Sequence, residues 1–470
     1  MTPKQIAAFA IGPIGAAAIS FITLPVITWF FSQEDVGRMS MLTVAISFST
    51  LLFTLGLDQA YVREFHESKN KPALFKQVVL PGLFLLSITL LVLLSLDNTI
   101  SFGLFGLDNT KISWLVAIAI LSDFLSRFFS LILRMQEKGM AYSLSQLLPK
   151  LILLSIISGY ALFDADREFD NLLTAIVVSA LSVCVIFAWN TRSTWLKGLR
   201  ESFDYQYLKS LLSFGFPLIF GGLAFWGLTA TDKIFLKELS SYEQLGLYSV
   251  SVSFAAAASI FQAIFSTVWA PTVYKWAATG EGLENIHKVT RYVLLAVIVL
   301  FSLAALFSWV VPYLLPENYK DVQWILIPCL GYPLLYTLSE TTVVGLGITR
   351  RSGLSMLAAS IAFVINLIGN WFLVPEYGAK GAAISTCIAF WFFFFLRTEF
   401  AIYAWKPIPR LMLYCYTSAA VCMAIFSCLY SVEFYIYHVL GWFVLLVSTI
   451  FYFKLEFFVL IKTITKGFSF

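Results

Sequence analysis

About fourteen stretches of this chain are apolar and long enough to cross a lipid bilayer. A spanning helix needs about 20 apolar residues, because each residue adds about 1.5 Å and the hydrocarbon core is about 30 Å thick. The sequence therefore predicts an all-α polytopic membrane protein. The expected spans lie at roughly 6–31, 37–57, 75–96, 112–133, 142–162, 171–190, 211–230, 245–270, 290–314, 322–344, 354–374, 381–404, 409–430 and 435–460.

Composition excludes several classes of function. Of the 470 residues, 59% are apolar and only 12% are charged, against roughly 25% charged in a soluble domain. The net charge of +4 offers no basic patch of the kind that binds nucleic acid. The six cysteines form no C-x-x-C pair and the three histidines are far apart, so we expect no metal ligands and no cofactor.

The basic residues alternate between the two sides of the predicted membrane. With the N-terminus placed inside, 22 of the 31 Lys and Arg fall in inner segments and seven in outer segments. The remaining two, Arg127 and Lys150, fall within helices. Such a bias over short loops follows the positive-inside rule. It predicts cytoplasmic N- and C-termini and an even number of spans.

An internal repeat predicts two bundles. Residues 32–40 share four identities with residues 241–249, and each segment enters the second helix of a six-helix set. Both copies lie on the outer side, which indicates two pseudo-symmetric six-helix bundles around a central cavity. We expect an N-terminal bundle at 1–190, a cytoplasmic linker at 191–210, a C-terminal bundle at 211–404 and two additional helices at 405–470.

Charged side chains inside helices are costly and often functional. The fourth span carries Asp123 and Arg127 at a spacing that allows an ion pair along the helix. Arg127 and Lys150 near mid-depth predict a water-filled cavity for an anionic cargo. Arg63 and Arg134 lie at the expected inner mouth. The structural alternative is that the Asp123–Arg127 pair joins two helices, while Arg63 and Arg134 are snorkelling anchors.

Other polar side chains follow the predicted helices at helical spacing. The second span carries hydroxyls that include Thr50 and Thr54 and that end at Asp58. Here the structural alternative is that the hydroxyls bond to backbone carbonyls. Further polar positions are Gln146, Glu340, Asn366 and Asn370.

Three segments resemble a known family. Pro25, Trp29-Phe-Phe and Glu34-Asp-Val-Gly, followed by Gly56-Leu-Asp-Gln and Arg63-Glu-Phe-His, resemble the opening of Wzx-type polysaccharide flippases. Asp232-Lys-Ile-Phe-Leu with Leu245-Gly-Leu-Tyr-Ser is similar to their mid-chain signature, with Lys233 where Arg is commoner. Residues 374–386 resemble a stretch that is widespread in the multidrug/oligosaccharidyl-lipid/polysaccharide (MOP) exporter superfamily.

The resemblance implies a function. Such proteins move undecaprenyl-pyrophosphate-linked oligosaccharides, such as O-antigen units of lipopolysaccharide, from the cytoplasmic to the periplasmic leaflet of the bacterial inner membrane. It also implies coupling to H⁺ or Na⁺, and it suggests polysaccharide polymerases and glycosyltransferases as pathway partners.

Site roles follow from this reading. For the pyrophosphate, the candidates are Arg127, Lys150, Arg63 and Arg134. For the glycan, they are Thr50, Thr54, Gln146, Tyr248, Asn366 and Asn370. For the coupling ion, they are Asp58, Asp123, Asp232 and Glu340.

Three other readings stay open from the residues. A multidrug/cation antiporter of the MATE type, in the same superfamily, would need acidic and aromatic groups in its cavity. A membrane enzyme acting on lipid-linked sugars would need a catalytic loop outside the membrane, and the predicted outer loops are short, so we expect no enzyme. A scaffold without a transport role would not need charges inside its helices.

Overall fold

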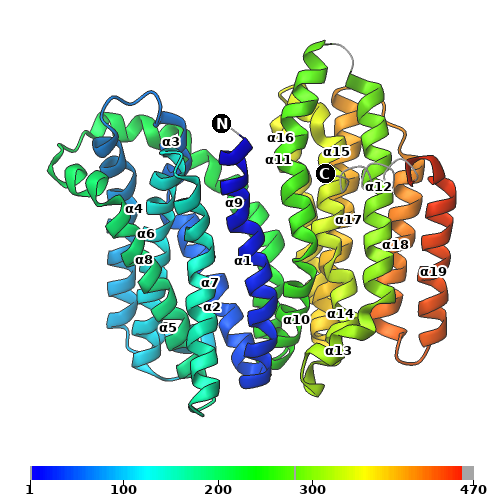
Figure 1. The fold of residues 1–470 in the computed structure, drawn as a ribbon, viewed down its shortest axis with the longest axis horizontal. Helices are drawn as coiled ribbons and strands as arrows, with labels where there is room; N and C mark the ends of the chain where they lie inside the picture. The colour runs from blue at the N-terminus through cyan, green and yellow to red at the C-terminus, as the bar shows by residue number, and fades with distance from the viewer. Residues whose placement is uncertain (1–2, 280–281, 458–470) are drawn as a thin grey trace. The chain divides into compact units, whose positions relative to one another are not determined.

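The computed structural model describes residues 3–279 and 282–457. The chain divides into two compact units, Met1–Trp226 and Gly227–Phe470, which we call unit 1 and unit 2. Every regular element in the described ranges is a helix (Figure 1). The prediction of an all-α membrane protein is therefore confirmed.

Unit 1 is built around α6, which packs against α2, α4, α7 and α8. Large apolar side chains of α6, such as Phe124, Phe128 and Ile132, are almost completely buried. Helix α9 continues from unit 1 into unit 2. The helices are α1 (Pro3–Phe30), α2 (Gln33–Phe53), α3 (Leu57–Glu64), α4 (Lys71–Ser95), α5 (Thr99–Phe105), α6 (Thr110–Met135), α7 (Gly139–Leu162), α8 (Phe169–Arg200) and α9 (Tyr205–Leu239).

Unit 2 has α15 and α17 at its centre, packed against each other. The C-terminal helices α18 and α19 pack on α12, and α18 also contacts α14 and α17, so they are part of unit 2. The elements are α10 (Tyr242–Ala255), α11 (Ala258–Thr279), α12 (Gly282–Leu306), η1 (Ser308–Val310), α13 (Val311–Leu314), η2 (Glu317–Tyr319), α14 (Val322–Cys329), α15 (Gly331–Ile348), α16 (Ser352–Tyr377), α17 (Ala379–Ala404), α18 (Leu411–Tyr430) and α19 (Tyr435–Tyr452).

Twelve helical segments within the described residues are long and apolar enough to cross a membrane. They establish a multi-pass membrane protein. All fourteen predicted spans coincide with helices, but α1, α10 and α11 are not among the twelve. The eighth predicted span, 245–270, is broken between α10 and α11. The number of fourteen therefore stays a prediction, and the part of the last span beyond residue 457 lies outside the described residues.

The boundary between the bundles differs from the predicted one. Helix α8 continues to Arg200 and α9 begins at Tyr205, so most of the expected linker at 191–210 is helical. The division between the units falls after Trp226, within α9. Hydropathy marks where a helix leaves the membrane, but it does not mark where the helix ends.

The two repeat segments begin their helices in the same way. The Ser32 hydroxyl accepts the backbone N–H of Asp35 at the start of α2, and the Ser241 hydroxyl accepts that of Gln244 at the start of α10. A Ser at this position satisfies one of the free N–H groups of the first turn, and replacing it costs about 1 kcal/mol. The similarity between residues 32–40 and 241–249 thus has a local physical basis.

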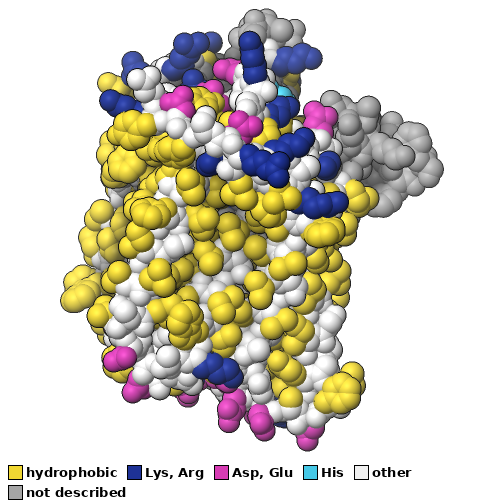
Figure 2. All heavy atoms as spheres, turned by 90° about the vertical axis from the view of Figure 1, so that its left-hand side faces the viewer, with side chains coloured by type: hydrophobic (Ala, Val, Ile, Leu, Met, Phe, Trp, Pro, Cys, Tyr) yellow, Lys and Arg dark blue, Asp and Glu magenta, His cyan; other side chains and the backbone are white. Residues whose placement is uncertain are grey.

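Charge is distributed unevenly along the helices. On the face shown in Figure 2, apolar side chains cover the middle, Lys and Arg gather toward one end, and acidic residues predominate at the other. Helices α6 and α8 both end in basic turns, with Arg134 on α6 and Lys197 and Arg200 on α8. An apolar zone bounded by charged ends is what a bilayer requires of the surface of a membrane protein.

Candidate functional site

Unit 1 contains an open cavity of about 870 Å³ among α2, α6, α7, α8 and the first part of α9. Its walls mix apolar side chains with hydroxyls, an amide and charges. Such a polar space among apolar helices suits a solute that cannot enter lipid. Six of the residues singled out from the sequence line it: Thr50, Thr54, Asp58, Asp123, Arg127 and Gln146.

The central contact of the cavity joins Arg127 to Asp58. The guanidinium Nη2 donates to Asp58 Oδ2 at 2.8 Å, and Gln59 donates to the same oxygen at 3.0 Å. The Arg127 side chain is 44% exposed and that of Asp58 only 10%. Arg127 thus keeps part of its planar donor surface on the cavity, in the form that binds phosphate in a bidentate manner.

The expected pair within α6 is not the one that forms. Asp123 instead accepts a hydrogen bond from Thr50 Oγ1 at 2.8 Å. The reason is tertiary: Asp58 approaches Arg127 from another segment, and spacing along one helix does not show that. Thr54 donates to the carbonyl of Leu51 at 3.3 Å, as the structural alternative for the hydroxyls predicts.

A break in the chain positions Asp58. Helix α2 ends at Phe53, and both Leu55 (φ 53°) and Gly56 (φ 68°) are left-handed before α3 begins. Asp58 therefore lies in the first turn of α3, at the wall of the cavity. A Cβ on Gly56 would clash with the carbonyl oxygen of Gly215. Only glycine allows both this φ and this contact.

The other predicted phosphate-binding residues do not line this cavity. Lys150 is exposed on α7, and Arg134 is exposed in the last turn of α6. Arg63 lies 3.6 Å from Glu64 and places its guanidinium 4.4 Å from the ring centre of Phe214. Of the four predicted cations, only Arg127 reaches the cavity.

Unit 2 contains a second polar cluster, centred on Asp232 of α9. This carboxylate is fully buried. Its Oδ1 accepts from Asn366 at 3.0 Å and from Asn370 at 2.7 Å, both on α16. Its Oδ2 accepts from Tyr248 of α10 and from Thr386 of α17. Asp232 was predicted to bind the coupling ion, and Tyr248, Asn366 and Asn370 were predicted to face the glycan. All four lie in this one cluster.

The buried positions change how these residues are interpreted. Tyr248, Asn366 and Asn370 were expected to face a glycan, yet each is at most 3% exposed and bonds to Asp232. Thr386 was not assigned a role from the sequence. The signal that could have found it was present, since Thr386 ends the family-like stretch at 374–386.

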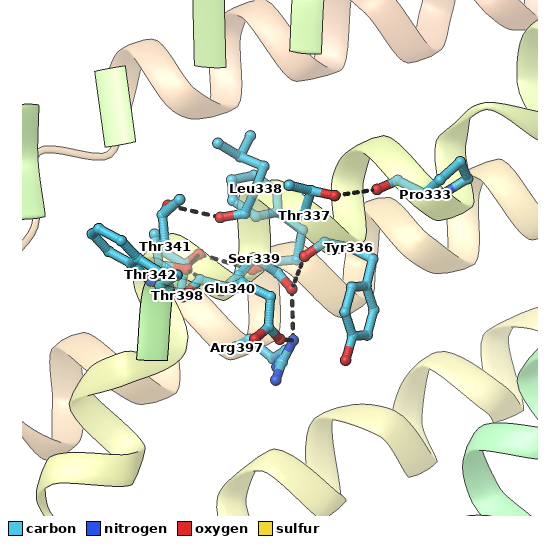
Figure 3. A network of polar contacts seen from close by, with 12 residues as sticks. Pro333, Tyr336, Thr337, Leu338, Ser339, Glu340, Thr341, Thr342, Arg397 and Thr398 are labelled. Carbon is cyan, nitrogen blue, oxygen red and sulfur yellow. Dashed lines mark hydrogen bonds and ion pairs between the residues drawn. The ribbon is translucent and has the colours of Figure 1, made fainter. Parts of the chain in front are cut away.

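The four acidic candidates differ in charge compensation. Asp58 has Arg127, and Glu340 has Arg397 at 2.8 Å (Figure 3). Asp232 and Asp123 make no ion pair within the described ranges, and the side-chain hydrogen bonds they accept come from neutral groups. Within the described residues, Asp232 is thus a fully buried carboxylate held by neutral donors, and Asp123 is a half-buried one.

The fold and these clusters define the class of protein. The arrangement of the helices is similar to that in the lipid II flippase MurJ in its inward closed conformation. The TM-score is 0.66 at 12% sequence identity, and the match covers 95% of this chain and 98% of that chain. The arrangement is also similar to an inward-facing multidrug resistance MATE transporter of the MOP superfamily, with a TM-score of 0.59 over 82% and 93% at 13% identity. The protein is a multi-pass membrane protein with the fold of these two proteins.

The family follows from the sequence itself. The model of the family described as "Polysaccharide biosynthesis protein" matches residues 4–276, more than half of the chain, so the chain belongs to this family. A curated relative is the probable low-salt glycan biosynthesis flippase Agl15 of Haloferax volcanii, 24% identical over 232 residues. That alignment covers 48% of this chain and 47% of the relative, so the chain spans about half the length of this relative.

Proposed function

We propose that the protein is a flippase that moves an undecaprenyl-pyrophosphate-linked oligosaccharide from the cytoplasmic to the periplasmic leaflet of a bacterial inner membrane. The cargo is an O-antigen unit or a similar surface polysaccharide unit, and transport proceeds by alternating access with both termini in the cytoplasm. The observation that carries the proposal is the polar cavity of unit 1, in a chain that belongs to a polysaccharide biosynthesis family.

The physical logic rests on the nature of the cargo. A lipid tail can stay in the bilayer, whereas a pyrophosphate and its sugars need a path away from hydrocarbon. Arg127 supplies planar donors for phosphate, and Thr50 and Gln146 supply neutral polar groups on the same cavity. Binding would then draw Arg127 from Asp58 toward the phosphate. Lys150, Arg63 and Arg134 would act on the anion outside this cavity.

We propose Asp232 as the group that binds the coupling ion. Two carboxylate oxygens and the hydroxyls of Tyr248 and Thr386 gather in one buried place. The amide groups of Asn366 and Asn370 turn their nitrogens to the carboxylate, while their side-chain oxygens are buried and neither accepts a hydrogen bond from a described residue. An all-oxygen set of this kind suits a hard cation such as Na⁺, and the carboxylate alone suits a proton.

One observation favours a second function. The cavity of unit 1 carries two carboxylates, Asp58 and Asp123, against the single guanidinium of Arg127. That balance suits a cationic drug, as in a multidrug/cation antiporter. In the flippase, by contrast, an anion would compete with Asp58 for Arg127.

Translocation in proteoliposomes decides between the two. The measurement is the exposure of extracted lipid-linked oligosaccharide in the opposite leaflet, for wild type, Arg127→Ala and Lys150→Ala. Lys197→Ala is the matched control, because Lys197 is an exposed cation on α8 outside the cavity. We expect a loss of about tenfold or more for Arg127→Ala and none for the control. Absence of wild-type translocation, together with export of cationic dyes, would support the antiporter instead.

A further inference from the structure

One face of α15 is open although the helix is central to unit 2. The span from Glu317 to Ile348 is more enclosed than any of the other eleven. Within α15, the last helix of this span, Tyr332, Tyr336 and Glu340 remain partly exposed, while the positions between them are buried. Steps of four residues place these three side chains on one face of the helix.

The chemistry of this face differs from that of a face exposed to lipid. On α16 the exposed large side chains are Met356, Leu357, Val364, Ile368, Trp371 and Phe372, with a single tyrosine, Tyr377, at the end of the helix. On α15 the partly exposed positions of the first part of the helix, up to residue 340, carry two phenols and a carboxylate instead. A carboxylate directed at hydrocarbon costs several kcal/mol, about 3 on insertion scales. The open face of α15 is therefore suited to water or to a polar solute.

Aromatic rings make this face rigid. Tyr336 stacks on Phe393 of α17 with ring centres 5.9 Å apart and planes 14° apart. Tyr332 lies 4.7 Å from Phe390 of the same helix. Phe390 and Phe393 are buried, so they support the two tyrosines from behind. Packing of this kind holds the tyrosine rings in fixed positions.

A neutralised ion pair lies next to the rings. Arg397 Nη1 donates to Glu340 Oε1 at 2.8 Å and to Ser339 Oγ at 2.7 Å. Its guanidinium also lies over the rings of Phe393, at 4.8 Å, and Tyr336, at 5.4 Å. In Figure 3, Tyr336, Glu340 and Arg397 project to the same side of α15, away from Leu338.

We propose that this face, formed by Tyr332, Tyr336, Glu340 and Arg397, binds the sugar rings of the cargo. A pyranose offers an apolar C–H face for an aromatic ring and hydroxyls for a carboxylate and a guanidinium. A phosphate suits the face less than it suits the cavity of unit 1, because the Arg397 side chain is only 11% exposed, whereas that of Arg127 is 44% exposed. A lipid tail needs neither charge. The inference deepens the proposed function, on which it rests, by naming the subsite for the glycan.

The test compares two lipids that differ only in sugar. The full-length protein is placed in nanodiscs, and the affinities for undecaprenyl pyrophosphate, bare or carrying an N-acetylglucosamine disaccharide, are measured by intrinsic tryptophan fluorescence. We expect wild type to bind the glycosylated lipid about tenfold tighter than the bare lipid. Tyr336→Leu should abolish this preference and leave the affinity for the bare lipid unchanged.

Matched variants separate loss of binding from loss of folding. Tyr336→Phe keeps the ring and should keep most of the preference, whereas Glu340→Gln should lower it about threefold. Tyr437→Leu removes an exposed tyrosine on α19 and should change nothing. A Tyr336→Leu variant that still prefers the glycosylated lipid overturns the inference, as does a wild type that binds both lipids equally. A wild type that binds neither lipid contradicts the flippase itself.

Discussion

Arg127 and Asp58 form an ion pair of unequal exposure, with 44% of the arginine side chain open to the cavity and only 10% of the aspartate. Arg127 can therefore meet a ligand, while Asp58 depends on its partners. Removing the arginine leaves a mostly buried carboxylate with Gln59 as its remaining side-chain donor. The pair thus links the stability of unit 1 to what occupies its cavity.

This asymmetry predicts unequal mutational effects. Arg127→Ala should destabilise the folded protein by about 1–2 kcal/mol, because Asp58 stays buried without its cation. The double variant Asp58→Ala/Arg127→Ala should be less destabilised than the sum of the single variants. Thermal unfolding of the four proteins in one detergent measures the coupling. Additive effects would show that the pair contributes nothing.

A second prediction concerns the break between α2 and α3. Gly56→Ala should destabilise the protein by about 2 kcal/mol or more, because alanine is strained at φ 68° and its Cβ would meet the Gly215 carbonyl. Gly103→Ala and Gly159→Ala are the controls, because a Cβ at either position meets nothing within 4 Å. Thermal unfolding distinguishes them, and equal midpoints for all three variants would contradict the expected contact.

A third prediction concerns the coupling ion. Asp232→Asn keeps the size of the side chain but removes its charge, so it should abolish stabilisation by Na⁺ and remove the part of the pH dependence that comes from Asp232. The measurement is the unfolding midpoint in NaCl against choline chloride at constant ionic strength, repeated at several pH values. A Na⁺ dependence that is lost in Asp232→Asn identifies sodium, and a pH dependence that decreases in this variant without any Na⁺ dependence identifies the proton. Asp166→Asn, at an exposed position, should behave like wild type.

A fourth prediction concerns the C-terminal helices. His438 of α19 is 1% exposed, with Nδ1 2.8 Å from the Ser427 hydroxyl and Nε2 3.3 Å from the Ala305 carbonyl. A carbonyl only accepts, so Nε2 carries a proton in the contact with Ala305, while Nδ1 lies within hydrogen-bond distance of the Ser427 hydroxyl. His438→Ala should therefore speed hydrogen exchange in α18 and α19. The exposed His66 provides the control, His66→Ala, and unchanged exchange in both variants would show that these contacts are dispensable.

The sequence predicts the helices well and their partners poorly. Apolar runs show where spans lie, because the bilayer sets the length and hydrophobicity of each span independently of distant residues. The pairing of Arg127 with Asp58 needs two segments 69 residues apart to meet, and local spacing favours Asp123 instead. The break at Leu55 and Gly56 has no signal in hydropathy. It depends on the close approach of Gly215.

The Asp232 cluster shows the same limit. Each member is visible in the sequence as a polar residue in an apolar helix, but its role is not. Asn370 lies 138 residues from Asp232 along the chain, so only the packing of α9 against α16 reveals that they share a hydrogen bond. Residue type alone therefore assigns the amides and the tyrosine of this cluster to the glycan and its carboxylate to the coupling ion, although they form one hydrogen-bonded group.

Four hydrogen-bond donors on α10, α16 and α17 converge on the single carboxylate of Asp232. Neutralising that oxygen pair weakens all four bonds at once, because a neutral acid accepts more weakly than a carboxylate. Neutralisation of the Asp232 carboxylate would thus act directly on three helices, because each of them donates a hydrogen bond to it. Under the proposed role of Asp232, uptake of the coupling ion should therefore change the contacts of α10, α16 and α17 together, measurable as a joint change in their hydrogen exchange.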